Sequence, residues 1–168
     1  PEMRGKNDPI YVTDKLTGMV YHEGPDIKFV KKELKKLVKF ANNQIGQDRF
    51  VHPVIKAIMI HFWIGYLHPF TDGNGRLARL VFYWYLLKEG YWAFAYLPIS
   101  KAIKRSPQQY SMAYVYSEQD DNDLTYFIDY NIKKIKLAMK EFTEYLKKQS
   151  QRNSKMKTKS QIANSLNT

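Results

Sequence analysis

The residues best suited to chemistry lie in one stretch of twelve, from His68 to Arg79. A histidine, which can accept a proton near pH 7, is followed four residues later by the carboxylate of Asp72. Residues 73–75, Gly-Asn-Gly, then open an expected helix, where free backbone N–H groups and the helix dipole favour an anion. Arg76 and Arg79 project from one side of that helix, and their guanidinium forks suit phosphate. The stretch predicts a polyphosphate site with a base beside it.

Two well-known phosphate-binding motifs are excluded by the same residues. No Gly-Lys-Ser/Thr follows, and the glycine spacing is wrong for a Walker A loop. A Rossmann fingerprint needs a third glycine and a preceding strand, whereas an apolar helix is expected before His68.

The stretch resembles the signature of the Fic family, His-x-Phe-x-Asp/Glu-Gly-Asn-Gly-Arg-x-x-Arg, and it matches every defined position. A less specific likeness of pattern extends from Ile10 to about Lys148. The resemblance implies an all-α fold, a Fic-type helical bundle with a small β-hairpin called the flap. It also implies a protein adenylyltransferase, which transfers AMP from ATP to a Ser, Thr or Tyr hydroxyl of a target protein or of itself and releases pyrophosphate.

By this resemblance each polar residue of the stretch has an expected role. His68 is the general base, and Asp72 holds the Mg²⁺ that bridges the α- and β-phosphates. Arg76 contacts the region of the β-phosphate, Arg79 fixes the γ-phosphate, and Phe70 orients the loop by packing.

The resemblance also gives the expected sets of site residues. The anion hole is formed by Gly73, Asn74 and Gly75. The catalytic residues are His68, Asn74 and Arg76, and the residues that bind ATP are Gly73, Asn74, Gly75, Arg76 and Arg79. The flap, at about residues 10–23, pairs with a segment of the target protein, which is the expected partner.

The elements that must position this stretch follow from periodicity and turn residues. Two β-prone runs, residues 10–13 and 19–22, flank a loop that ends in Gly18, which predicts a hairpin. Asp26 is the expected N-cap of a helix whose apolar face is Ile27, Val30, Leu34, Leu37, Val38 and Ala41. Further helices are expected at about 54–67, from 73–75 to 88, after an N-cap at Ser100, from 106–107 to 118, and at 124–148.

Composition and charge limit the classes of protein. The 168 residues are 44% hydrophobic and contain no cysteine, which fits one globular domain and excludes disulfides and cysteine-based zinc sites. Of the net charge of +11, residues 133–168 carry +8. We therefore expect a lead-in at 1–9, a catalytic domain at 10–149 and a basic, mobile tail or linker at 150–168. A nucleic-acid partner is disfavoured, and no apolar run predicts a membrane span.

Several alternatives remain beside AMP transfer. One alternative is an enzyme on the same scaffold that removes AMP or uses another nucleotide or diphosphate-linked donor; retention of Gly73 and Gly75 favours AMP transfer over phosphorylation. A silent binding module and a nucleic-acid-binding protein are weaker hypotheses. A metal site of His61, His68 and Asp72 is disfavoured, because Pro69 redirects the chain and no Glu base is near.

The remaining tyrosines and histidines, and the regulation of the site, are outside the signature. Tyr110, Tyr114 and Tyr116 are assigned to the core in preference to a wall of the adenine pocket, and His22 and His52 to structural or exposed positions. Many Fic proteins carry an inhibitory helix whose Glu pairs with the residue equivalent to Arg79. No convincing copy occurs here, so that helix is expected upstream of Pro1 or on a separate protein. A cytoplasmic location is expected from family habit.

Overall fold

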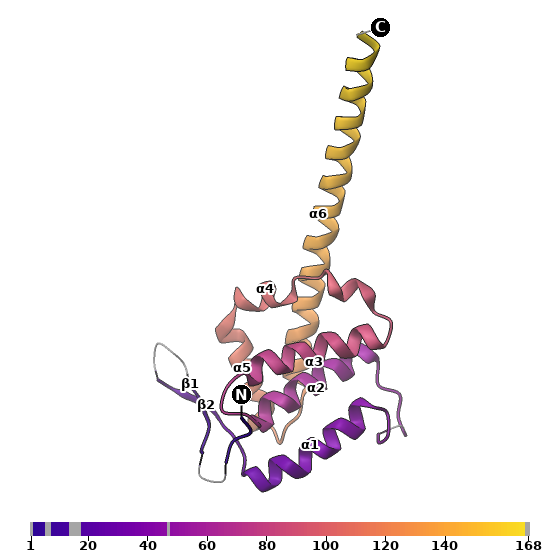
Figure 1. Cartoon of the computed structure of the whole chain (residues 1–168). Helices are drawn as coiled ribbons and strands as arrows, with labels where there is room; N and C mark the ends of the chain where they lie inside the picture. The colour runs from indigo at the N-terminus through magenta and orange to yellow at the C-terminus, as the bar shows by residue number, and fades with distance from the viewer. Residues whose placement is uncertain (1, 6–7, 14–17, 47, 167–168) are drawn as a thin grey trace.

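A computed structural model describes residues 2–5, 8–13, 18–46 and 48–166 of the chain. It is a bundle of helices with one two-stranded antiparallel hairpin, which confirms the all-α class with a small β-hairpin (Figure 1). Its elements in chain order are β1 (Tyr11–Thr13), β2 (Val20–Glu23), α1 (Ile27–Ala41), α2 (Pro53–Leu67), α3 (Asn74–Lys88), the 3₁₀ turn η1 (Trp92–Ala95), α4 (Ile99–Lys104), α5 (Pro107–Gln119) and α6 (Thr125–Leu166).

Helix α2 lies at the centre of the bundle and packs against α1, α3 and α6. Its residues are apolar on nearly every side, so it can be surrounded by other helices. Ala57, Ile58 and Ile60 have no exposed surface. Pro53 occupies the first turn as predicted, and the His52 side chain accepts a hydrogen bond from the Val54 N–H.

The hairpin occupies the two runs that the sequence predicts. Tyr11 pairs with Glu23 and Val12 with His22, and a bulge follows Val12. Residues 14–17 of the expected loop lie outside the described residues. The Gly24 N–H donates to the carbonyl of Ile10, which closes the base of the hairpin next to α1.

The first helix begins as predicted, but its buried face differs from the expected one. Asp26 caps α1 by accepting from the Lys28 N–H. Val38, which was expected on the buried face, is 55% exposed, and Phe40 is buried instead. The expected face was wrong at Val38 because the ring of Phe40 packs against Trp63 and beneath the ammonium group of Lys56.

Two predicted helix boundaries were wrong. Helix α4 begins at Ile99, with Pro98 and not Ser100 as its N-cap, since the carbonyl of Pro98 accepts from Lys101 and Ala102. Helix α6 continues to Leu166 instead of ending near Lys148. Residues 149–166 contain neither proline nor glycine, so no residue interrupts the helix.

Helix α6 extends far beyond the bundle (Figure 1). Its first part packs in the core through Phe127, Tyr130, Ile135 and Ala138, and most of the side chains from Thr143 to Met156 are exposed. The division of the chain at residues 9 and 149 remains a prediction. In the described ranges, no helix has the length and apolarity needed to cross a membrane.

His61 is a core residue and takes no part in the disfavoured metal site. Its side chain is 4% exposed, its Nε2 lies 3.1 Å from the Tyr110 hydroxyl, and its ring meets the edges or faces of Phe82 and Phe127. Burial, helped by the charge of Arg79, lowers the pKa of His61 from 6.5 to about 4.

This burial predicts a pH dependence of stability. Between pH 6.5 and pH 4 the unfolded chain binds a proton at His61, whereas the folded chain does not. The free energy of unfolding therefore falls as the pH falls through this window. We expect His61→Gln, which keeps a polar partner for Tyr110 but does not titrate, to remove about 3 kcal/mol of that loss. Urea unfolding of the parent and the variant at a series of pH values measures this pH dependence. A curve for the variant that runs parallel to the parent curve would contradict the prediction.

Candidate active site

His68 ends α2 in a backbone conformation that is unusual for its type. It occupies the left-handed region, at φ 42° and ψ 58°, while its N–H donates to the Ile64 carbonyl. A residue other than glycine rarely adopts this conformation unless its surroundings enforce it. The side chain is therefore directed by the end of the helix and by the contacts that the following loop makes.

The hydrogen bonds of His68 determine which ring nitrogen can act as a base. Its Nδ1 lies 2.7 Å from the carbonyl oxygen of Gly65. Because a carbonyl oxygen only accepts, Nδ1 carries the proton, and Nε2 keeps its lone pair. The neutral ring is thus held in the tautomer that can take a proton from a substrate.

The surroundings of His68 favour its neutral form. Burial lowers the pKa of His68 below its ordinary value of 6.5. The Gly65 carbonyl and Glu118 oppose this shift, while His22 and Arg4 add to it. A histidine that stays neutral at physiological pH is a competent general base.

The loop after His68 is closed by Asn74 and by the start of the chain. The Asn74 side chain is 3% exposed; its amide donates to the Phe70 carbonyl, and its Oδ1 accepts from the Phe70 N–H. Met3 forms a bridge with Phe70, and the Thr71 N–H donates to the Glu2 carbonyl. The side chain of Asn74 is therefore used to shape the loop, which leaves its backbone N–H for an anion.

The first turn of α3 presents free donors. Gly73 precedes the helix at φ +88°, a value that favours glycine, and the first helical bond runs from the Leu77 N–H to the Gly73 carbonyl. The N–H groups of Asn74, Gly75 and Arg76 meet no acceptor within the described part of the chain. Such a turn is an anion site by its geometry and dipole.

Asp72 and Arg76 form an exposed ion pair at the mouth of this turn. Their side chains lie 2.8 Å apart, and the other carboxylate oxygen of Asp72 accepts from the Gly73 N–H at 2.6 Å. A carboxylate in this position fits Mg²⁺, which is commonly bound by one or two carboxylates together with substrate phosphates. No cluster of three acidic, His or Cys ligands occurs among the described residues, so phosphate and water would complete the coordination.

Two adjoining pockets meet at His68. A polar pocket of about 360 Å³ lies over the start of α3 and is lined by Ile10, Tyr11, His68, Thr71, Asp72, Gly73, Asn74, Gly75, Arg76 and Arg79. A mainly apolar pocket of about 190 Å³ is lined by Val12, Tyr21, His22, Gly65, His68, Gly75, Ala78, Arg79, Tyr110, Ser111 and Tyr114. The structure thus brings every predicted polar site residue to the polar pocket, and it places a smaller aromatic pocket beside it.

The three tyrosines that were assigned to the core differ in burial. Tyr110 and Tyr114 belong to the core, as expected, and also line the apolar pocket. The assignment of Tyr116 to the core was wrong: it is 47% exposed, because its ring contacts Tyr126, which is itself at the surface. Gly65 allows the close approach of α5, because a Cβ there would lie 2.9 Å from the Tyr114 hydroxyl.

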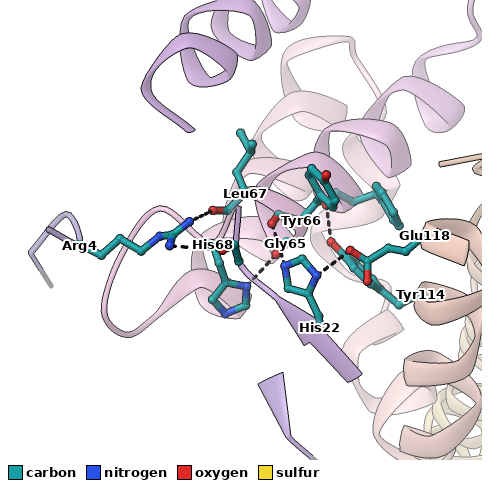
Figure 2. Close-up of polar contacts among 10 residues, drawn as sticks. Arg4, His22, Gly65, Tyr66, Leu67, His68, Tyr114 and Glu118 are labelled. Carbon is teal, nitrogen blue, oxygen red and sulfur yellow. Dashed lines mark hydrogen bonds and ion pairs between the residues drawn. The ribbon is translucent and has the colours of Figure 1, made fainter. Parts of the chain in front are cut away.

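Three residues that the sequence analysis did not assign to the site hold it in place (Figure 2). The last turn of a helix leaves carbonyl groups without helical partners. In α2 the Gly65 carbonyl accepts from His68, the Tyr66 carbonyl lies 2.8 Å from His22 Nε2, and the Leu67 carbonyl accepts from Arg4. Glu118 in turn pairs with His22. No local pattern marks Arg4, His22 or Glu118, since their partners are far away in the sequence.

Comparison with known proteins agrees with the resemblance. Residues 4–86 match the model described as the Fic/DOC family. The chain is similar to the protein adenylyltransferase fic-1 of Caenorhabditis elegans, 33% identical over 64 residues, which are 38% of this chain and 12% of that protein. It is also similar to the protein adenylyltransferase Fic of Nematostella vectensis, 46% identical over 58 residues, which are 34% and 14% of the two chains. These matches therefore cover a small part of each relative.

A solved structure shows the same fold. The crystal structure of a Fic family protein from Desulfovibrio desulfuricans G20 superposes with a TM-score of 0.67 over 80% of this chain and 41% of that chain, at 24% sequence identity. At this identity the likeness concerns the fold alone.

The buried guanidinium group of Arg4 gives a test of how the site is held. It donates to the carbonyls of Gly24, Pro25 and Leu67, and its side chain is buried. We expect Arg4→Met, which keeps the apolar stem of the side chain but removes the guanidinium group, to lower the free energy of unfolding by about 2–3 kcal/mol, because these carbonyls lose a charged donor. Urea unfolding measures it, with Arg49→Met at an exposed position as control. Equal stabilities of the two variants would show that Arg4 does not hold the site.

Proposed function

This chain belongs to the Fic/DOC family through residues 4–86, and from that premise we propose that it is a protein adenylyltransferase, which transfers AMP from ATP to a hydroxyl of a target protein. The chain matches only part of the relatives that bear this name, so the activity rests on the site itself.

One observation carries the proposal: a neutral histidine with a free Nε2 lies where a polar pocket meets an apolar one. The polar pocket combines free N–H donors with Arg76 and Arg79, which suits a polyphosphate. The apolar pocket, walled by Tyr110 and Tyr114, suits a planar base. A nucleoside triphosphate that spans both pockets would place its α-phosphate near His68.

The reaction then follows from these positions. The hydroxyl oxygen of the target forms a bond to the α-phosphorus, and its proton passes to Nε2 of His68. The bond between the α-phosphorus and the oxygen that bridges to the β-phosphate breaks, and pyrophosphate leaves. Arg76 and the N–H groups at the start of α3 stabilise the charge that develops on the phosphate oxygens.

Asp72 would hold Mg²⁺ together with the phosphates. When bound, Mg²⁺ supplies charge neutralisation and alignment of the triphosphate. Because Asp72 pairs with Arg76 at 2.8 Å, the carboxylate also keeps the guanidinium group at the mouth of the polar pocket before ATP arrives.

The flap would bind the target. Among the described residues it consists of two strands, so each strand has one edge without a strand partner, and Ile10 and Tyr11 line the polar pocket. A target segment that adds to such an edge makes main-chain hydrogen bonds and tolerates varied side chains. Arg79 has no acidic partner in the described ranges, which leaves it available to a γ-phosphate or to an inhibitory Glu. A cytoplasmic location stays a prediction.

We expect the purified chain, with Mg²⁺ and ATP labelled at the α-phosphate, to label itself and to gain the mass of one AMP. His68→Ala should reduce the initial rate about 10²–10⁴-fold, as for loss of a general base. His52→Ala, which removes an exposed histidine outside both pockets, should keep the parental rate. Gel autoradiography and intact mass measure both.

Label that arrives from the γ-phosphate but not from the α-phosphate would overturn AMP transfer in favour of phosphorylation. Equal rates for His68→Ala and the parent would remove His68 from the mechanism. Binding of ATP without any transfer would favour AMP removal, which release of AMP from a modified protein tests directly.

A further inference from the structure

His22 lies where the hairpin meets the helices, and both of its ring nitrogens face acceptors. Its side chain is 4% exposed. Nε2 lies 2.8 Å from the Tyr66 carbonyl oxygen, and Nδ1 lies 2.6 Å from a carboxylate oxygen of Glu118. A carbonyl oxygen and an ionised carboxylate can only accept, so both contacts are hydrogen bonds only when both nitrogens carry protons.

The surroundings favour such a cation. The C-terminal end of α2, to which Tyr66 belongs, carries the negative pole of the helix dipole. Glu118, on α5, supplies a full negative charge in a side chain that is 17% exposed. The rings of Tyr66 and Tyr114 lie 5.6 and 5.9 Å from the ring of His22, and these aromatic neighbours exclude much of the water that would weaken the pair.

The ring of His22 also lies 5.8 Å from the ring of His68 (Figure 2). Two positive charges at this separation repel each other. A protonated His22 therefore makes it harder to protonate His68, while its two hydrogen bonds attach strand β2 to α2 and α5.

We propose that His22 is a positioning residue for the proposed transfer: as an imidazolium held between Glu118 and the Tyr66 carbonyl, it fixes the flap over the end of α2 and keeps His68 in the neutral form that accepts a proton. This inference deepens the proposed function and rests on it for the role of His68. The protonation state of His22 follows from its contacts and does not depend on the proposed activity.

The charged groups that face His68 set the expected direction of change. His22 faces it from β2, Arg4 from the start of the chain and Glu118 from α5, and Arg79 of α3 lines the same pocket. Removing His22 leaves Glu118 unpaired beside His68, so His68 becomes easier to protonate. Removing Glu118 takes away the anion that favours protonated His68, but also the partner that keeps His22 charged, so its two effects on His68 oppose each other.

The first measurement is made on the parent chain and needs no activity. In long-range ¹H–¹⁵N spectra of the chain at neutral pH, with resonances assigned by His68→Ala and His22→Gln, we expect both nitrogens of His22 to be protonated and His68 to be protonated at Nδ1 alone. A neutral His22 in the folded chain would overturn the inference, whether or not AMP transfer is observed.

The second measurement follows the titration of His68. We expect His22→Gln to raise the midpoint of His68 by about one pH unit, and Glu118→Gln to leave it unchanged or lower it. His52→Gln, at an exposed position, is the control and should leave it unchanged. An unchanged midpoint in folded His22→Gln would reduce His22 to a structural contact and overturn the inference.

The same variants connect the inference to activity. The acidic limb of the pH profile of kcat/KM for AMP transfer should move to higher pH in His22→Gln, by the shift seen in the spectra. This limb reports the ionisation of the free enzyme. A rate that falls equally at all pH values would contradict the effect on His68. If the parent transfers no AMP at any pH while the spectra behave as expected, the proposed function fails and the assignment of His22 stands.

Discussion

The site depends on the end of one helix. Any α-helix ends with carbonyl groups that its own backbone cannot satisfy, and in α2 this end is surrounded by other segments. Gly65, Tyr66 and Leu67 offer three successive carbonyls, and each meets a side chain from a different part of the chain. The demand of buried carbonyls for donors thus brings together the base, the hairpin and the start of the chain.

This arrangement also separates the charges of the site. The donors at the end of α2 include Arg4 and His22, which suit the negative pole of the helix dipole. The next helix, α3, presents its positive pole and free N–H groups to the polar pocket. His68 lies between the two ends, half-buried and neutral, because burial outweighs the neighbouring anion. The cationic donors thus lie on one side of His68 and the anion site lies on the other.

The parts of the site that the sequence could predict are local ones. The residues from His68 to Arg79 were expected to meet because they lie on one loop and the first turns of one helix, and they line one pocket. The hairpin and most helix boundaries likewise follow from short patterns. The roles of Arg4, His22 and Glu118 depend on contacts between segments 44 to 96 positions apart in the sequence, and no periodicity reports such contacts. The expected buried face failed at Val38 for the same reason, since Phe40 is covered by groups of α2.

The residues from His68 to Arg79 and the residues that contact them from distant segments have different physical tasks. The glycines, Asn74 and the arginines create shape and donors for an anion, which a short stretch can encode because each task concerns its own backbone or charge. The ionisation of a base depends instead on everything within about 6 Å of it. In this chain the charged groups that act on His68 come from β2, α5 and the residues before the hairpin. A signature of twelve residues therefore specifies which groups are present, whereas the fold as a whole determines the protonation state in which His68 is held.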